Sequence, residues 1–415
     1  MKDNNTIAIK IKEQIEIFCK RITGGMKKDK KRFLNEMIFG IQAGRDIKLS
    51  NISRSLDEKI KLIKTENRLS RQINGEDLTE RINKEIIKDG ANKIEEDTVL
   101  ALDLSDISKR YAKKMEYMDE VWNGSEERID KGYWICEVIG AGVKSDWVIP
   151  LYGKVYSPAA KGYESENSEI LEAVKKVSEE TNKRGIWVID RGGDRIKIIE
   201  NIEKMEVKFV IRMTSKRNVK DKNGEEKNIL RYAENYECKE GYTVKIDKEG
   251  VIEEHEIRLG STEVKIKEKE YILVIIKGFG NEPMMLLTNV EKSAKEILEI
   301  YLTRWKCEEG FRFLKQEYHL EDVRVRSYVG IRNTMSLLQA VFYFISVRIG
   351  KRMKMNILLK KILEKAKRFF EEPVFKQYAI ADGIYRVLFH TKYDFYAKKM
   401  PRDTGQFEFD FVLEI

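Results

Sequence analysis

The chain has 415 residues, of which 42% are hydrophobic and 36% charged, and its formal net charge is +9. This length allows two or three domains, and positive charge spread along the chain favours a nucleic acid as the partner. Four scattered cysteines and three histidines make a zinc site improbable, so a catalytic metal would need carboxylate ligands. The longest apolar stretch, residues 337–347, is too short to span a bilayer, so we expect no membrane role.

Residues 1–95 are basic, and their apolar residues recur at helical spacing, as between Phe33 and Ile41. A second short helix is expected after Ser50. We interpret residues 1–95 as a small helical domain that binds DNA. A plain helical bundle or a dimerisation segment is the alternative, because helix-turn-helix patterns are weak in a single sequence.

Residues 96–213 change to short apolar runs that are rich in strand formers. Strands are expected within residues 98–106, 133–142, 146–157, 185–190 and 207–213, and helices within 169–181 and 193–202. Three strands followed by helix, strand, helix and strand predict the first part of an α/β core with a mixed sheet.

Residues 214–290 are polar and alternating, with turn signals at Asn223–Gly224 and Glu249–Gly250, which predicts an inserted antiparallel β-region. Residues 291–329 are expected to supply a helix that completes the core. Residues 330–415 are expected to be mainly helical, with two long helices up to about residue 370, and dimerisation is the role considered for them.

Two aspartates lie in or after the expected strands. Asp103 is expected at the end of the first strand, an otherwise apolar run in which a carboxylate costs stability unless it is paired or bound to a metal. Asp106 competes with it for a catalytic role. Asp190 closes the fourth strand and is followed by Arg191 and two glycines, which let a ligand approach the backbone closely. Asp194 is better explained as the N-cap of the next helix.

One continuous helix is expected after a capping-box signal at Ser293 and Glu296. At 100° per residue, four of its side chains project within roughly 60° of one another. These are Tyr301, Arg304, Glu308 and Lys315, and Arg312 joins them. Glu309 is turned away from them. A solvated, salt-bridged helix face is the alternative interpretation. Two strand aspartates and a helix glutamate can together hold two divalent ions about 3.5–4 Å apart.

Together these residues resemble the cut-and-paste DDE transposases of bacterial insertion sequences. The third acid of that family carries the signature Y-(2)-R-(3)-E-(6)-K, matched at every spacing by Tyr301, Arg304, Glu308 and Lys315. Its second acid often precedes Arg-Gly, as Asp190 does, and its first lies in an Asp-x-Ser context, as Asp103 does.

The resemblance implies a ribonuclease-H-like mixed-sheet core, interrupted by a β-rich insertion, with helical N- and C-terminal regions. It implies that Asp103, Asp190 and Glu308 are catalytic and bind two Mg²⁺ or Mn²⁺ ions. The residues expected to contact DNA are Tyr301, Arg304, Arg312, Lys315 and Arg191. Trp305 is expected to pack rather than to bind.

The implied function is a transposase that binds terminal inverted repeats, cleaves DNA by metal-dependent hydrolysis and transfers the 3′-hydroxyl end into target DNA. A homodimer on DNA, in the bacterial cytoplasm at the nucleoid, is the expected state. Two alternatives stay open: a catalytically inactive DNA-binding protein derived from a transposase, and a ribonuclease-H-like nuclease without strand transfer. A haloacid-dehalogenase-type phosphatase is disfavoured, because Asp103 and Asp106 do not form its Asp-x-Asp motif.

Overall fold

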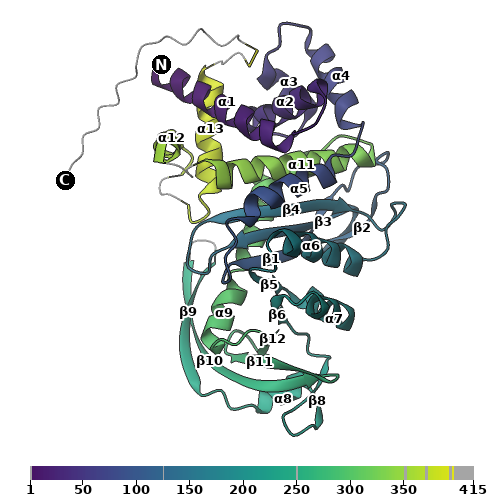
Figure 1. Cartoon of the computed structure of the whole chain (residues 1–415), viewed down its shortest axis with the longest axis vertical. Helices are drawn as coiled ribbons and strands as arrows, with labels where there is room; N and C mark the ends of the chain where they lie inside the picture. The colour runs from purple at the N-terminus through teal and green to yellow at the C-terminus, as the bar shows by residue number, and fades with distance from the viewer. Residues whose placement is uncertain are drawn as a thin grey trace, which may run out of the picture.

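Amphipathic segments at the start of the chain fold into helices. The computed structural model describes residues 2–124, 126–248, 251–349, 353–369, 373–391 and 395–396. The first helices are α1 (Lys2–Ile22), α2 (Lys28–Gly44), α3 (Leu49–Leu56), α4 (Leu62–Ile73) and α5 (Thr79–Ala91). They lie at one end of the molecule, together with C-terminal helices (Figure 1).

The apolar runs that follow build a mixed sheet. Its strands are β1 (Val99–Ser108), β2 (Asp119–Asn123), β3 (Arg128–Ala141), β4 (Val148–Tyr156), β5 (Ile186–Ile189) and β6 (Lys208–Arg212). The helical elements between them are α6 (Glu166–Glu180), η1 (Arg191–Gly193) and α7 (Ile196–Lys204). β4, β3 and β1 pair antiparallel, and β5 and β6 continue parallel to β1. This order is ribonuclease-H-like, as expected.

Two details of this core differ from the sequence-based expectation. β2 was not predicted, because its five residues contain no apolar run. Asp103 does not end the first strand, since β1 continues to Ser108 through pairing with β3. Backbone pairing with a long neighbouring strand therefore overrides the local polarity of residues 103–106.

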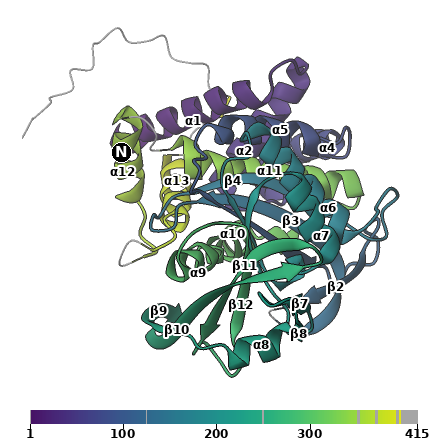
Figure 2. The same cartoon turned by 60° about the horizontal axis from the view of Figure 1, so that its bottom comes forward.

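The β-rich insertion extends the core sheet. Its elements are β7 (Asn218–Lys220), β8 (Glu226–Asn228), α8 (Ile229–Asn235), β9 (Glu240–Lys248), β10 (Val251–Ile266), β11 (Lys269–Lys277) and β12 (Met284–Thr288). β12 pairs antiparallel with β6, so core and insertion share one 12-stranded sheet within the described residues. Figure 2 shows the long, curved strands of this part. Gly224 has φ 82° in the predicted turn, whereas Glu249–Gly250 lies outside the described residues.

The remaining elements return to the core and the helical end. They are α9 (Ala294–Leu302), α10 (Trp305–Glu317), η2 (Leu320–Asp322), α11 (Tyr328–Tyr343), the π-helical turn η3 (Phe344–Arg348), α12 (Met353–Leu363) and α13 (Gln377–Thr391). No helix in the described part of the chain is long and apolar enough to cross a membrane.

The prediction of one continuous helix from Tyr301 to Lys315 is wrong, because α9 and α10 are separated at Thr303 and Arg304. Backbone hydrogen bonds there tighten to the i→i+3 type, such as Arg304 N to Tyr301 O at 3.0 Å. Thr303 Oγ1 also donates to the carbonyl of Glu299 at 2.9 Å. A β-branched residue bonded back to the preceding turn bends a helix, and this bend sets the direction in which α10 leaves.

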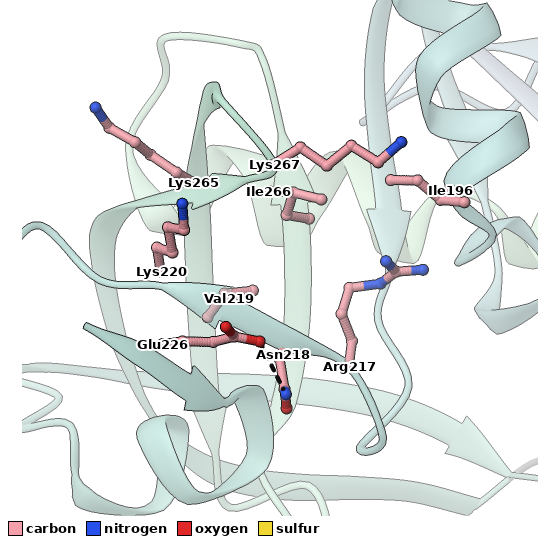
Figure 3. Close-up of a pocket in the computed structure, with 9 residues that line it drawn as sticks. All are labelled: Ile196, Arg217, Asn218, Val219, Lys220, Glu226, Lys265, Ile266 and Lys267. Atoms are coloured by element: carbon pink, nitrogen blue, oxygen red, sulfur yellow. Dashed lines mark hydrogen bonds between the residues drawn. The ribbon is translucent and has the colours of Figure 1, made fainter. Parts of the chain in front are cut away.

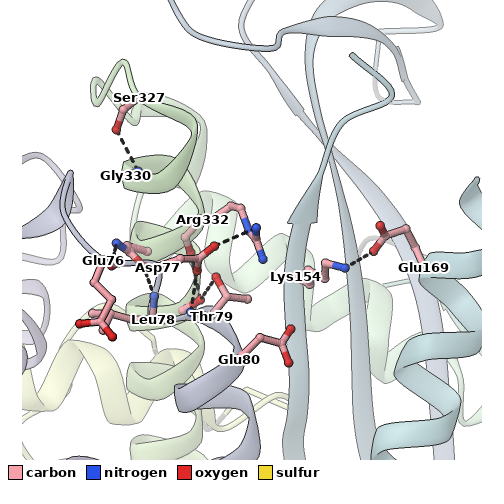
Figure 4. Close-up of polar contacts among 12 residues, drawn as sticks. Glu76, Asp77, Leu78, Thr79, Glu80, Lys154, Glu169, Ser327, Gly330 and Arg332 are labelled. Atoms are coloured by element: carbon pink, nitrogen blue, oxygen red, sulfur yellow. Dashed lines mark hydrogen bonds and ion pairs between the residues drawn. The ribbon is translucent and has the colours of Figure 1, made fainter. Parts of the chain in front are cut away.

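α11 joins the first helices to the sheet. Arg332 forms an ion pair with Asp77 at 2.8 Å (Figure 4). The side chain of Asn333, fully buried, accepts from Leu78 N at 2.7 Å and donates to Ile73 O at 2.8 Å. These contacts fix the end of α4 and the start of α5 against the core helix.

Candidate active site

Three carboxylates from separate elements approach one another at the centre of the core. Asp103 lies in β1, and Asp190 directly follows β5. β1 and β5 are parallel, with Leu102 opposite Ile189, so the two aspartates follow at the same level of adjacent strands. Glu308 comes from the first turn of α10. The structure thus brings together the three acids that the sequence predicted.

Arg304 connects two of these acids. Its Nη1 donates to Asp103 Oδ2 at 2.9 Å, and its Nη2 forms an ion pair with Glu308. The guanidinium lies 5.8 Å from the centroid of the Tyr301 ring. Burial disfavours the charged form, but the nearby carboxylates outweigh it and raise the Arg304 pKa. Without a metal ion, Arg304 neutralises the cluster.

The pKa of Asp103 is shifted far from that of an ordinary aspartate. Burial raises its pKa to about 7; Arg304 opposes this shift, and the charges of Asp190 and Glu308 add to it. Glu308, in contrast, has a half-exposed side chain. A carboxyl group whose pKa lies near neutrality, next to two other acids, is typical of a functional site.

The turn after β5 is held by side-chain contacts. Asp190 Oδ1 accepts a hydrogen bond from Gly192 N at 2.7 Å. Asp194 does not cap α7 as expected, because it accepts from the backbone N and Oγ1 of Thr214, both at 2.7 Å, and pairs with Arg217. The N-cap of α7 is Arg195, without a side-chain cap. Asp194 therefore ties the turn that presents Asp190 to the insertion.

A hollow of about 310 Å³ lies between α7 and the insertion (Figure 3). Arg217, Lys220, Lys265 and Lys267 line it, and each is paired with an acid. The local charge is therefore balanced, and the hollow is a salt-bridged surface rather than an anion site.

Sequence reasoning missed Glu137. It is the β3 residue opposite Asp103, it is fully buried, and neither of its carboxyl oxygens has a hydrogen-bond partner of ordinary geometry within the described residues. Burial and the neighbouring Asp103 raise its pKa well above the usual range, and Gln339 offsets only part of this. A glutamate inside the apolar run of residues 133–142 was the available signal.

α10 seats closely on β3 above Glu137. A Cβ atom on Gly310 would lie 2.6 Å from Ile139 Cδ1 and 3.5 Å from Glu137 Oε2. Cys307, one turn earlier, is also fully buried against this strand, with Sγ 4.0 Å from the Glu137 carbonyl. Gly310 therefore sets how near Glu308 comes to the sheet.

The other residues predicted on this helix face lie in three different environments. Tyr301 is only 5% exposed, so it packs beneath Arg304 rather than facing solvent. Lys315 Nζ lies 3.2 Å from Asp106 Oδ1, so this second aspartate of β1 pairs away from the three acids. Arg312 is exposed and pairs with Glu309.

Two residues beside the cluster face solvent. Arg191 is exposed on η1, directly after Asp190. Trp305, expected to pack, is instead 41% exposed. It is the first residue of α10, immediately after Arg304.

The comparisons with known proteins address the family. Residues 159–345 match the family model described as the transposase DDE domain. This segment is therefore similar to a transposase DDE domain. The matched segment contains Asp190 and Glu308 and begins after Asp103. No curated protein matches the sequence.

Among solved structures, the chain is similar to the piggyBac transposase in its synaptic complex with hairpin DNA, determined by cryo-electron microscopy. The TM-score is 0.40 and the identity 11%, and the similarity covers 84% of this chain and 61% of that chain. The chain thus spans less than two thirds of that protein.

Asp103, Asp190 and Glu308 suit a hard divalent cation in donor type, since carboxylate oxygens are the ligands that Mg²⁺ and Mn²⁺ take. Within the described residues, however, no three acidic, histidine or cysteine side chains already lie close enough to hold a metal ion. Arg304 holds Asp103 and Glu308 instead. A metal ion would therefore have to replace the guanidinium as the partner of these two carboxylates.

Proposed function

We propose that this DDE transposase binds the terminal inverted repeats of its element, cleaves there by metal-dependent hydrolysis and transfers the 3′-hydroxyl end into target DNA. The observation that carries this proposal is the approach of Asp103, Asp190 and Glu308, from two strands and a helix, around Arg304. Nothing in the packing of the core requires three acids at this point, and each costs stability there.

Asp103, Asp190 and Glu308 would hold Mg²⁺ or Mn²⁺, two ions per site. When bound, such ions supply activation of the attacking oxygen and stabilisation of the departing one. The role of the chain is then to place the phosphodiester. Arg304, released from the carboxylates, becomes available to a phosphate oxygen, to which a guanidinium binds in a bidentate manner.

The remaining cations extend this DNA contact. Lys315, Arg312 and Arg191 lie on or beside the elements that carry the acids, and Arg312 is 59% exposed. Tyr301 acts through Arg304, since its ring lies beneath that guanidinium. Residues 1–95 would bind duplex DNA, and residues 330–415 would contribute to a homodimer when two transposon ends are joined.

The test uses purified full-length protein and labelled DNA that carries the element's own ends, with Mg²⁺. Wild type should produce end-specific nicks and joined products, while Glu308→Gln should produce neither. Loss of a metal ligand removes several kcal/mol of transition-state stabilisation, on the order of 10³-fold in rate. Glu309→Gln, the adjacent acid that pairs with Arg312, is the matched control and should remain active.

Other outcomes separate the alternatives. Binding of the ends without cleavage by wild type would contradict the proposal and favour an inactive DNA-binding protein. Nicking at any sequence without joining would favour a nuclease that lacks strand transfer.

A further inference from the structure

α3 and α4 form a pair of short helices joined by residues 57–61, in which Asp57 adopts φ 45°. The inner face of α4 is fixed by packing, because Thr65, Leu69 and Ile73 are buried. Arg68 also points inward, where it forms ion pairs with acids of the helical region. The helix is therefore held rigidly by one face.

The outer face of α4 has a different character. Lys64, Asn67 and Arg71 are exposed, and their spacing of three and four residues places them on one side of the helix. Together with Ser70 they line an open hollow of about 510 Å³. Within the described residues, neither Lys64 nor Arg71 pairs with a carboxylate. Arg71 Nε makes only a 3.4 Å contact to the carbonyl of Asn67.

Unpaired cations at this face contrast with those elsewhere. The four cations of the hollow in Figure 3 each have an acidic partner. The turn before α4 and the first residues of α4 add exposed Lys59 and Lys61 and expose three large apolar side chains. These are Ile60 in the turn and Leu62 and Ile63 in α4, which are 47%, 39% and 55% exposed. A merely solvated face has no reason to expose such a group.

We infer that α4 enters the major groove of duplex DNA, where Asn67 and Arg71 read base edges while Lys61 and Lys64 hold phosphates. This inference deepens the proposed function, on which it rests, by assigning the surface that recognises the transposon ends. Basic charge on the exposed face complements the phosphate backbone. A 12-residue helix is about 18 Å long, and the major groove, about 12 Å wide, admits a helix.

The residue types suit base recognition. Arginine forms paired hydrogen bonds with guanine, and asparagine does so with adenine. Exposed apolar side chains at the start of such a helix suit thymine methyl groups. Asn333 anchors the other end of α4 through the carbonyl of Ile73, which keeps the face in a fixed position relative to the core.

The test is selection from a pool of duplexes with about 20 random base pairs, followed by affinity measurements on the selected duplex. Wild type should enrich one motif. Asn67→Ala and Arg71→Ala should each lose preference at different positions and bind the motif about tenfold or more weakly, since a paired base contact contributes about 1–3 kcal/mol. Lys64→Ala should weaken binding to all sequences alike and lower the salt dependence by about one counterion.

Lys175→Ala is the matched control, because Lys175 is a 66% exposed cation on α6. It should select the wild-type motif with wild-type affinity. Unchanged melting temperatures show that the α4 variants fold. The inference is overturned if both α4 variants select the wild-type motif with equal affinity, or if wild type selects no motif. It is also overturned if Ile60→Ser with Ile63→Ser alters the oligomeric state but not DNA selection, which would mark a protein interface.

Failure of this inference and failure of the proposed function have different signatures. Wild type that selects a motif but does not cleave it would contradict the proposed function and support α4 as the reading helix. Wild type that cleaves DNA carrying the selected motif, together with Arg71→Ala that no longer selects this motif, would support both. Glu308→Gln should keep the motif and lose cleavage.

Discussion

The acid cluster around Arg304 and the outer face of α4 are both rich in charge, but only the acid cluster is neutralised from within. Arg304 contacts Asp103 and Glu308, and burial leaves Asp103 with a pKa of about 7. On α4, Lys64 and Arg71 have no acidic partner among the described residues. The two regions therefore differ in whether their charged groups already have partners of opposite charge within the chain.

On the proposed functions, this difference would separate recognition from chemistry. The basic face offers unpaired cations to DNA, whereas a metal ion would have to replace Arg304 as the partner of Asp103 and Glu308. A three-acid cluster without a cationic partner would carry repulsion that destabilises the fold. The ion pairs of Arg304 with Asp103 and Glu308 relieve that repulsion within the chain.

The largest expected effect comes from removing Arg304. In Arg304→Ala, we expect the affinity for Mn²⁺ without DNA to rise about tenfold, because the competing cation is gone. Cleavage of end-containing DNA should fall on the order of 10²-fold, because a charge-assisted contact to phosphate is lost. Calorimetric titration with Mn²⁺ and single-turnover cleavage measure the two effects.

Arg312→Ala serves as the control, since Arg312 is an exposed cation that pairs with Glu309 rather than with the three acids. Its metal affinity should stay at the wild-type value. If Arg304→Ala instead bound Mn²⁺ more weakly, the guanidinium would not compete with metal, and the contrast between the two regions would be wrong.

The second effect is the dependence of stability on pH. The folded-state pKa of Asp103 is about 7, above the value of 3.8 for an unperturbed aspartate. The folded state therefore binds more protons than the unfolded state between these values, so stability should fall as pH rises from about 4 to about 7. The loss is a few kcal/mol at most. Melting scans across this range measure it.

Asp103→Asn should flatten part of this fall, while Glu309→Gln should leave it unchanged. Because Mn²⁺ competes with the proton on Asp103, the metal should raise the wild-type melting temperature more at pH 8 than at pH 6. An equal rise at both pH values would show that Asp103 is not a ligand.

The sequence predicted the order of the core strands and the three acids, because both depend on local signals. Apolar runs of strand length marked β1, β5 and β6, and aspartates at 103 and 190 interrupted or closed such runs. The Tyr-Arg-Glu-Lys spacing required only that residues 301–315 be near-helical. Arg304 and Glu308 still pair across the break between α9 and α10, so the wrong prediction of one continuous helix did not affect the prediction of these two residues.

What the sequence did not predict depends on contacts between distant segments. The pairing of Arg304 with Asp103, the tie from Asp194 to Arg217 and the burial of Glu137 join residues far apart in the chain. From the local sequence alone, Asp194 was interpreted as the N-cap of a helix, because its distant partner Arg217 cannot be read from that pattern. The sequence also did not show that Arg304 pairs with Asp103 and Glu308, because residue spacing alone does not show which carboxylate a cation reaches.

The smallest effect tests whether the cluster depends on the seating of α10 while the α4 face does not. In Gly310→Ala, a Cβ atom would lie 2.6 Å from Ile139 Cδ1, so that either this side chain or α10 must shift. Overpacking costs about 1–3 kcal/mol, and the better helix propensity of alanine returns up to about 1 kcal/mol, so the melting temperature should fall only slightly. Cleavage should fall about tenfold, because a small misplacement of Glu308 is enough.

Gly241→Ala, whose Cβ would meet no atom within 4 Å, is the control and should change neither the melting temperature nor the cleavage rate. DNA affinity should stay at the wild-type value in both variants, and a parallel loss of binding in Gly310→Ala would show that the two regions are coupled through α10.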